Sequence, residues 1–136
     1  MIPFHLAFPI RDIEETRRFY RDVLGCTVGR EAPRWIDFDF FGHQLSAHVR
    51  PEELGAVRTN ELDGDAVPVR HFGAVLPWAE WEALAGRIRA AGLGFLIEPH
   101  VRFQGQPGEQ GTFFVNDPAG NALEFKTFRD PKQMFA

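Results

Sequence analysis

The sequence has one cysteine, no long apolar run and no excess of positive charge, and each of these absences excludes a class of protein. Cys26 has no partner for an internal disulfide, so no disulfide framework holds this fold. The apolar runs are far shorter than the ~20 residues that a membrane span needs. With 15 Lys and Arg against 19 Asp and Glu, the chain lacks the basic surface that binds phosphate backbones. We therefore expect neither a nucleic-acid nor a membrane partner.

The sequence does have the length and apolar content of a single folded domain. Its 136 residues are 44% hydrophobic, which excludes a disordered chain. The first residues lack the charged start and apolar stretch of a secretory signal. We therefore expect one domain over 1–136 in a cytoplasmic protein.

The first half of the sequence alternates between strand and helix patterns. Residues 4–9 are short and apolar, as in a strand. Asp12 then stands where a helix N-cap would, and an apolar stripe at helical spacing ends at Gly25. Three further strands are predicted at 26–28, 35–40 and 44–49. The segment 4–50 is thus predicted to be a βαβββ module.

The second half repeats this pattern after a polar, turn-rich segment at 51–68, which we interpret as a linker. The second module, 69–128, is predicted to begin with a strand and a helix and to continue with three strands, at 69–75, 78–91, 95–99, 111–115 and 122–128. Because neither module can bury its sheet alone, we expect them to pack together. The predicted fold is α+β, with duplicated βαβββ modules forming a curved sheet that bears a cleft.

Three side chains form a candidate metal site. His5 and His71 occupy equivalent positions on the first strand of each module, and Glu124 lies on the last strand of the second. Alternation places Glu124 on the opposite face to its neighbours Leu123 and Phe125. Two imidazoles and one carboxylate match the facial set that leaves coordination positions open on a non-haem Fe(II).

The duplication, the two histidines and the stretch Phe114–Phe125 around Asp117-Pro118-Ala119-Gly120-Asn121 resemble the vicinal oxygen chelate superfamily. This superfamily includes glyoxalase I, bleomycin resistance proteins, fosfomycin resistance enzymes and extradiol dioxygenases. The resemblance implies a divalent metal held by His5, His71 and Glu124, with Fe(II) favoured and Mn(II), Ni(II) or Zn(II) as alternatives. It also implies a small substrate bound through two neighbouring oxygens, and a homodimer.

Two positions favour the small dioxygenase-like members. Ser46 stands where glyoxalase I commonly has a fourth protein ligand, so the four-ligand pattern is incomplete. His48 lies two residues further on the same strand face, and extradiol enzymes place a non-ligand histidine near the metal. The resemblance therefore implies an enzyme that adds O₂ to a small substrate, catecholic in the simplest case, with His48 as catalytic acid/base.

Other readings of these residues stay open. Extradiol dioxygenases typically carry a tyrosine before the glutamate ligand, where this chain has Phe113 and Phe114. A glyoxalase-type isomerase or a resistance-type transferase is the first alternative. A metal-free drug-binding protein is the second, and it would not require His5, His71 and Glu124 together. The residues that bind substrate are not identifiable from the sequence.

Overall fold

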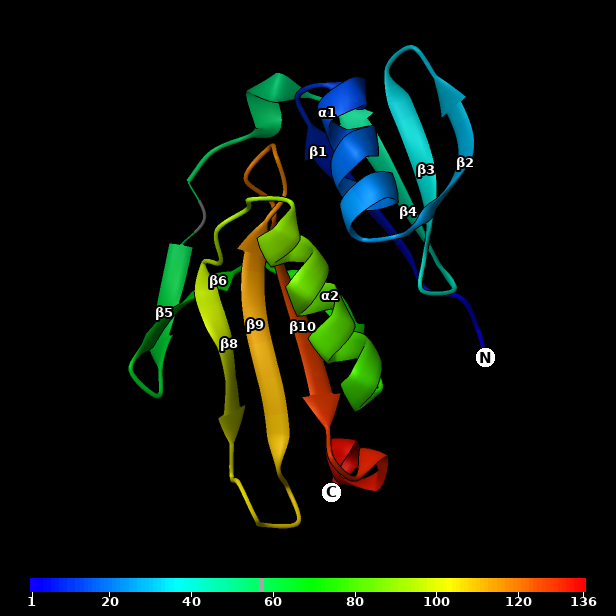
Figure 1. Cartoon of the computed structure of the whole chain (residues 1–136). Coiled ribbons are helices and arrows are strands. Elements are labelled where there is room, and N and C mark those ends of the chain that lie inside the picture. Colours follow the sequence, from blue (N-terminus) through cyan, green and yellow to red (C-terminus); the bar gives the residue numbers. More distant parts are fainter. Residues whose placement is uncertain (57) are drawn as a thin grey trace. The chain divides into compact units, whose positions relative to one another are not determined.

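The computed structural model describes residues 1–56 and 58–136, and its chain divides into two compact units (Figure 1). The first unit contains Met1–Ala56 together with Asp117–Asn121. The second contains the described residues from 58–116 and 122–136. In these residues no helix is long and apolar enough to cross a membrane.

The first unit is a four-stranded sheet with helical turns. Its strands are β1 (His5–Ile10), β2 (Thr27–Ala32), β3 (Trp35–Phe40) and β4 (His43–Val49). They are ordered β1-β4-β3-β2, with β1 and β4 parallel and the other pairs antiparallel. Helix α1 (Ile13–Arg17) begins at the predicted cap, where Asp12 accepts a hydrogen bond from the Glu15 N–H at 2.9 Å. A π-helical stretch, η1 (Arg18–Val23), continues it.

The second unit repeats this topology. Its sheet is ordered β7-β10-β9-β8, again with the first pair parallel. Its elements are β7 (Phe72–Val75), α2 (Trp78–Ala90), β8 (Ile97–Arg102), β9 (Gln110–Asn116) and β10 (Ala122–Phe128), and a 3₁₀ turn, η3 (Pro131–Phe135), ends the chain. The predicted α+β class and the duplicated βαβββ pattern are confirmed.

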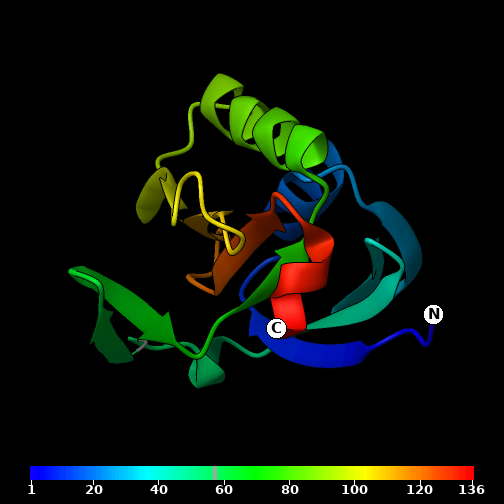
Figure 2. The same cartoon turned by 90° about the horizontal axis from the view of Figure 1, so that it is seen from below.

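The segment 51–68, expected to be a linker, contains structure of its own. A 3₁₀ turn, η2 (Pro51–Glu53), is followed by a hairpin of β5 (Arg58–Leu62) and β6 (Asp65–Val69). Asp63 and Gly64 connect the strands, with φ of 52° and 86°. An Asp-Gly pair with two positive φ values is a typical hairpin turn, so the signal was present in the sequence. Within the second unit, the hairpin and α2 lie on opposite sides of the sheet (Figure 2).

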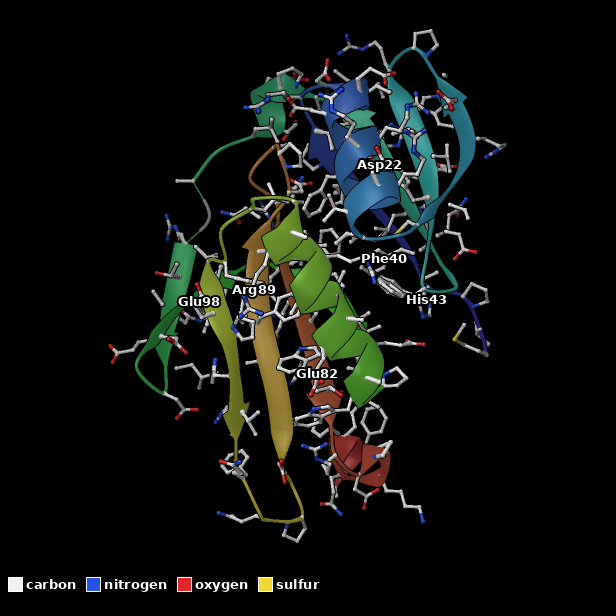
Figure 3. The ribbon with its side chains drawn as sticks, in the orientation of Figure 1. Asp22, Phe40, His43, Glu82, Arg89 and Glu98 are labelled. Atoms are coloured by element: carbon white, nitrogen blue, oxygen red, sulfur yellow. The ribbon has the colours of Figure 1, made fainter. Side chains whose placement is uncertain are left out.

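The face of the second sheet under α2 forms the hydrophobic core of that unit. Trp81 of α2 is 5% exposed, and its indole N–H donates to the Phe125 carbonyl at 2.9 Å. Gly111 makes this approach possible, because a Cβ there would lie 2.8 Å from the Trp81 ring. At the end of the helix, Arg89 lies 3.8 Å from Glu98 of β8, and both are labelled in Figure 3. The opposite face of this sheet is left for polar side chains.

The turn-forming loop Asp117–Asn121 belongs to the first unit. The fully buried Tyr20 donates its hydroxyl to Asp117 at 2.9 Å, and the Asn121 side chain donates to the Pro9 carbonyl at 2.8 Å. Burial raises the pKa of Asp117, against hydrogen bonds from Asn121, Tyr20 and Ala119 that lower it. Burial, followed by the nearby Asp117 charge, also raises the pKa of Tyr20, so the phenol stays a donor.

Candidate metal centre

Two of the three predicted metal ligands lie side by side in the second unit. The His71 Nε2 atom is 3.2 Å from Glu124 Oε1, and the two side chains are 28% and 18% exposed. Glu124 is on β10, and His71 directly precedes β7, the parallel neighbour of β10. Gly73 makes the close pairing of these strands possible, because a Cβ there would lie 1.6 Å from the Glu124 carbonyl oxygen.

Each member of this pair is oriented by a second hydrogen bond. His71 Nδ1 is 2.6 Å from the Pro68 carbonyl oxygen, which can only accept, so Nδ1 carries the proton. In neutral His71, Nε2 is then the unprotonated nitrogen, and it is the ring nitrogen next to Glu124 Oε1. The Thr112 hydroxyl donates to Glu124 Oε2 at 2.6 Å, which leaves Oε1 facing the imidazole. Bonds of this kind fix the tautomer and the orientation of metal ligands.

The two sheets carry equivalent positions in the same register. In the second sheet Gly73 pairs with Glu124, and in the first Ala7 pairs with Ser46. His71 and His5 each stand two residues before the first member of these pairs. Ser46 is therefore the structural equivalent of Glu124.

The third predicted ligand lies in the first unit. His5 Nδ1 is 3.0 Å from the Gln44 side-chain oxygen, an acceptor, so this ring also keeps Nε2 unprotonated when neutral. His5 is exposed. All three predicted ligands thus have a carbonyl, amide or hydroxyl group that orients them.

Ser46 and His48 share one face of β4 because they are two residues apart. Ser46 is buried and donates its hydroxyl to Asp37 Oδ1 at 2.7 Å. The side chain at the position equivalent to Glu124 is thus already engaged in a hydrogen bond. His48 is exposed and lies opposite Trp35 of β3. Gln44, the hydrogen-bond partner of His5, stands four residues before His48 on the same strand. The Cα atoms of Gln44 and His48 are therefore about 13 Å apart. In register, the equivalent of His48 in the second sheet is Lys126, because Pro9 pairs with His48 and Val75 with Lys126.

In the part of the chain that the structure describes, no three His, Cys, Asp or Glu side chains gather as a metal-binding group. The structure brings His71 and Glu124 together, whereas His5 and His48 belong to the other unit. The donor chemistry nevertheless suits a divalent metal, since two imidazole nitrogens and one carboxylate match a facial set. The fit rests on two imidazoles whose Nδ1 atoms face acceptors and on a carboxylate that accepts from a hydroxyl.

A pocket of about 260 Å³ surrounds the His71–Glu124 pair. Its floor is the polar face of β8, β9 and β10, and its other wall is the β5–β6 hairpin. Phe114 contributes an aromatic ring to the lining of the pocket. The centroids of the Phe114 and His71 rings are 5.0 Å apart, and the angle between the ring planes is 79°. Sequence reasoning missed Thr112, although its alternation with Phe113 would have placed it on the face of Glu124.

Charged pairs link the hairpin to the sheet. Asp63 pairs with Arg102, and Asp65 lies 3.9 Å from the His100 imidazole. His100 reaches this face through a register shift in β8, where Ile97 pairs with Phe114 and His100 with Thr112. The hairpin therefore closes one side of the pocket through acidic side chains.

Comparisons with known proteins place these features in a family. The model of the Glyoxalase/Bleomycin resistance protein/Dioxygenase superfamily matches residues 2–125. A glyoxalase/bleomycin resistance protein/dioxygenase crystal structure from Alicyclobacillus acidocaldarius is 35% identical, with a TM-score of 0.81, over 98% of this chain and 96% of that chain. No curated protein sequence matches significantly.

Two more distant structures share the fold. The fosfomycin resistance protein FosX from Listeria monocytogenes is 17% identical, with a TM-score of 0.73, over 98% of this chain and 100% of that chain. A lactoylglutathione lyase from Agrobacterium tumefaciens is 20% identical, with a TM-score of 0.64, over 93% of this chain and 92% of that one.

Proposed function

The chain belongs to the glyoxalase/bleomycin resistance protein/dioxygenase superfamily, and from that premise we propose that it is a metal-dependent enzyme. His5, His71 and Glu124 are the proposed ligands. The observation that carries the proposal is the pair of His71 Nε2 and Glu124 Oε1, 3.2 Å apart and each anchored by a second group. A carboxylate oxygen and an imidazole nitrogen held this close together are typical neighbours in a divalent metal site.

The proposed reaction is the addition of O₂ to a small substrate that carries two neighbouring oxygens. When bound, the metal, Fe(II) in the first instance, supplies Lewis acidity and coordination positions that the protein leaves open. The engagement of Ser46 with Asp37 supports a set of three protein ligands, because the position equivalent to Glu124 offers no free carboxylate or amide. His48 is proposed to exchange the substrate proton, as a histidine can near neutral pH.

A glyoxalase-type isomerase or resistance-type transferase on Mn(II), Ni(II) or Zn(II) is the second candidate. One observation favours it. Phe114, opposite Glu124 in the β9–β10 register, places a ring without a hydroxyl against His71, so this position offers a substrate no hydrogen-bond donor. A homodimer is proposed for either reaction, and sedimentation of the purified chain tests it.

Metal content and oxygen uptake test the proposal together. The protein is purified anaerobically without a His-tag, beside His5→Ala, His71→Ala and Glu124→Ala. His43→Gln is the matched control, because His43 Nδ1 accepts from the Phe4 backbone N–H and belongs to no proposed ligand set. We expect near-stoichiometric iron in the wild type and the control, its loss in the three ligand variants, and oxygen uptake with catechol.

Other outcomes assign the remaining functions. Manganese, nickel or zinc without oxygen uptake supports the isomerase or transferase. No metal after reconstitution, with all variants folded and unchanged, overturns the enzyme proposal and leaves a metal-free binding protein.

A further inference from the structure

The pocket around His71 and Glu124 contains a cation whose partner is not a carboxylate. Lys126 lies two residues beyond Glu124 on β10 and lines the same pocket. Its ammonium nitrogen is 5.6 Å from the Phe128 ring centroid. In the described residues, Lys126 forms no ion pair within 4.0 Å. The other cationic group at this wall, Arg102, is already paired with Asp63.

The charges of the pocket leave a positive balance once a divalent metal is counted. Among the carboxylates and the Lys and Arg side chains, Glu124, Asp63 and Asp65 contribute three negative charges, and Lys126 and Arg102 contribute two positive ones. A divalent cation on His71 and Glu124 makes the sum positive by one. The positive charge is concentrated on the β10 side, because Asp63 and Asp65 of the hairpin contact Arg102 and His100 of β8. An anion that enters the pocket would therefore find Lys126 without a carboxylate partner.

The size and walls of the pocket limit that anion to a small molecule. Its volume of about 260 Å³ is slightly smaller than the ~300 Å³ of the smallest typical ligand pockets. Phe114, Leu62 and Val67 supply apolar wall, so a single ring or a short carbon skeleton fits between them. The polar groups stand at two places along β10, with the metal pair at Glu124 and the ammonium at Lys126.

We propose that the substrate is a small carboxylate with two neighbouring oxygens, and that Lys126 binds its carboxylate while those oxygens occupy the metal site. This inference rests on the proposed metal-dependent function and specifies its substrate class. Lys126 acts as a specificity-determining residue. In register it is the counterpart of His48 in the first sheet.

Two pairs of probes test this without turnover. On the zinc-loaded protein, calorimetry compares protocatechuate with catechol, which differ by one carboxylate. On the metal-free protein, it compares benzoate with benzamide, which isolates the carboxylate from the metal. Both are repeated with Lys126→Gln, and with Lys132→Gln as the control. The sequence has only these two lysines, and Lys132 is exposed in the terminal turn η3.

In the wild type and in Lys132→Gln we expect protocatechuate to bind about tenfold more tightly than catechol, as a close charge pair in a pocket gives. In Lys126→Gln we expect protocatechuate to bind about as tightly as catechol does. Zinc content and catechol affinity stay unchanged. The hydroxyls of protocatechuate and catechol differ in acidity, and this difference affects every variant alike. The ratio of the two affinities is therefore compared between variants. Lys126→Arg, which keeps the charge, restores most of the preference.

The outcomes separate this inference from the proposed function. A preference that survives in Lys126→Gln, or that is absent from the wild type while catechol binds, overturns the inference and leaves the metal enzyme. If zinc and catechol fail to bind but benzoate binds the wild type and not Lys126→Gln, the carboxylate site stands and the metal function falls. If benzoate too binds no better than benzamide, both fall.

Discussion

Replacing Tyr20 by phenylalanine removes the hydroxyl that donates a buried hydrogen bond to the Asp117–Asn121 loop. Tyr20 is fully buried, Asp117 is 4% exposed, and their oxygens are 2.9 Å apart. Asp117 keeps three donors from Ala119 and Asn121, so the variant loses one charge-assisted bond and leaves no bare carboxylate. We expect a loss of about 1.5–3 kcal/mol in the free energy of unfolding, measured by urea denaturation at pH 7.

The pH dependence of this loss follows from the pKa of Asp117. Because that pKa is raised in the folded state, the folded protein holds the proton more tightly than the unfolded chain does. The resulting stability is present below the unfolded pKa, about 3.9, and is lost as pH rises through the raised folded value. The Tyr20 bond opposes the rise. We therefore expect the difference between wild type and Tyr20→Phe to widen as pH increases through the titration of Asp117.

Thr127→Val is the matched control for removing a buried hydroxyl. Thr127 Oγ1 is buried without a hydrogen-bond partner among the described residues. Its replacement by a methyl group is expected to leave stability unchanged or to raise it by up to about 1 kcal/mol. If Tyr20→Phe changed stability by no more than Thr127→Val at every pH, the Tyr20–Asp117 bond would not contribute to stability and the reasoning would be refuted.

Two further substitutions test the metal centre. Thr112→Val removes the hydroxyl that donates to Glu124 at 2.6 Å and should weaken metal affinity about 10–100-fold in a chelator competition, whereas an unchanged affinity would show that Thr112 does not orient the ligand. Gly73→Ala places a Cβ 1.6 Å from the Glu124 carbonyl oxygen and should separate β7 from β10. A loss of about 3 kcal/mol or more is expected in thermal unfolding, and a variant as stable as the wild type would contradict the close pairing.

Local patterns in the sequence determined the modules of this protein. Alternation and helical spacing predicted most strands and both helices of the modules, because these periods follow from backbone geometry. The predicted strand 69–75 was wrong in its bounds, since Val69 ends β6 and β7 begins only at Phe72. The Asp12 cap was predicted for the same reason and is confirmed by its bond to Glu15. The repeat of the pattern predicted the duplicated topology. The Asp63-Gly64 turn shows the limit, because a polar, acidic segment was interpreted as a linker although its turn residues were those of a hairpin.

Only the tertiary structure decided which groups surround the predicted ligands. The Pro68 carbonyl, the Thr112 hydroxyl and the ammonium of Lys126 reach the pocket through strand pairing and chain reversal, which no local period encodes. Sequence reasoning identified His71 and Glu124 by residue type and repeat position. Their separation of 3.2 Å follows from the parallel β7–β10 register, which Gly73 permits. The candidate ligands were thus visible in the sequence, and their orientation was set by long-range contacts.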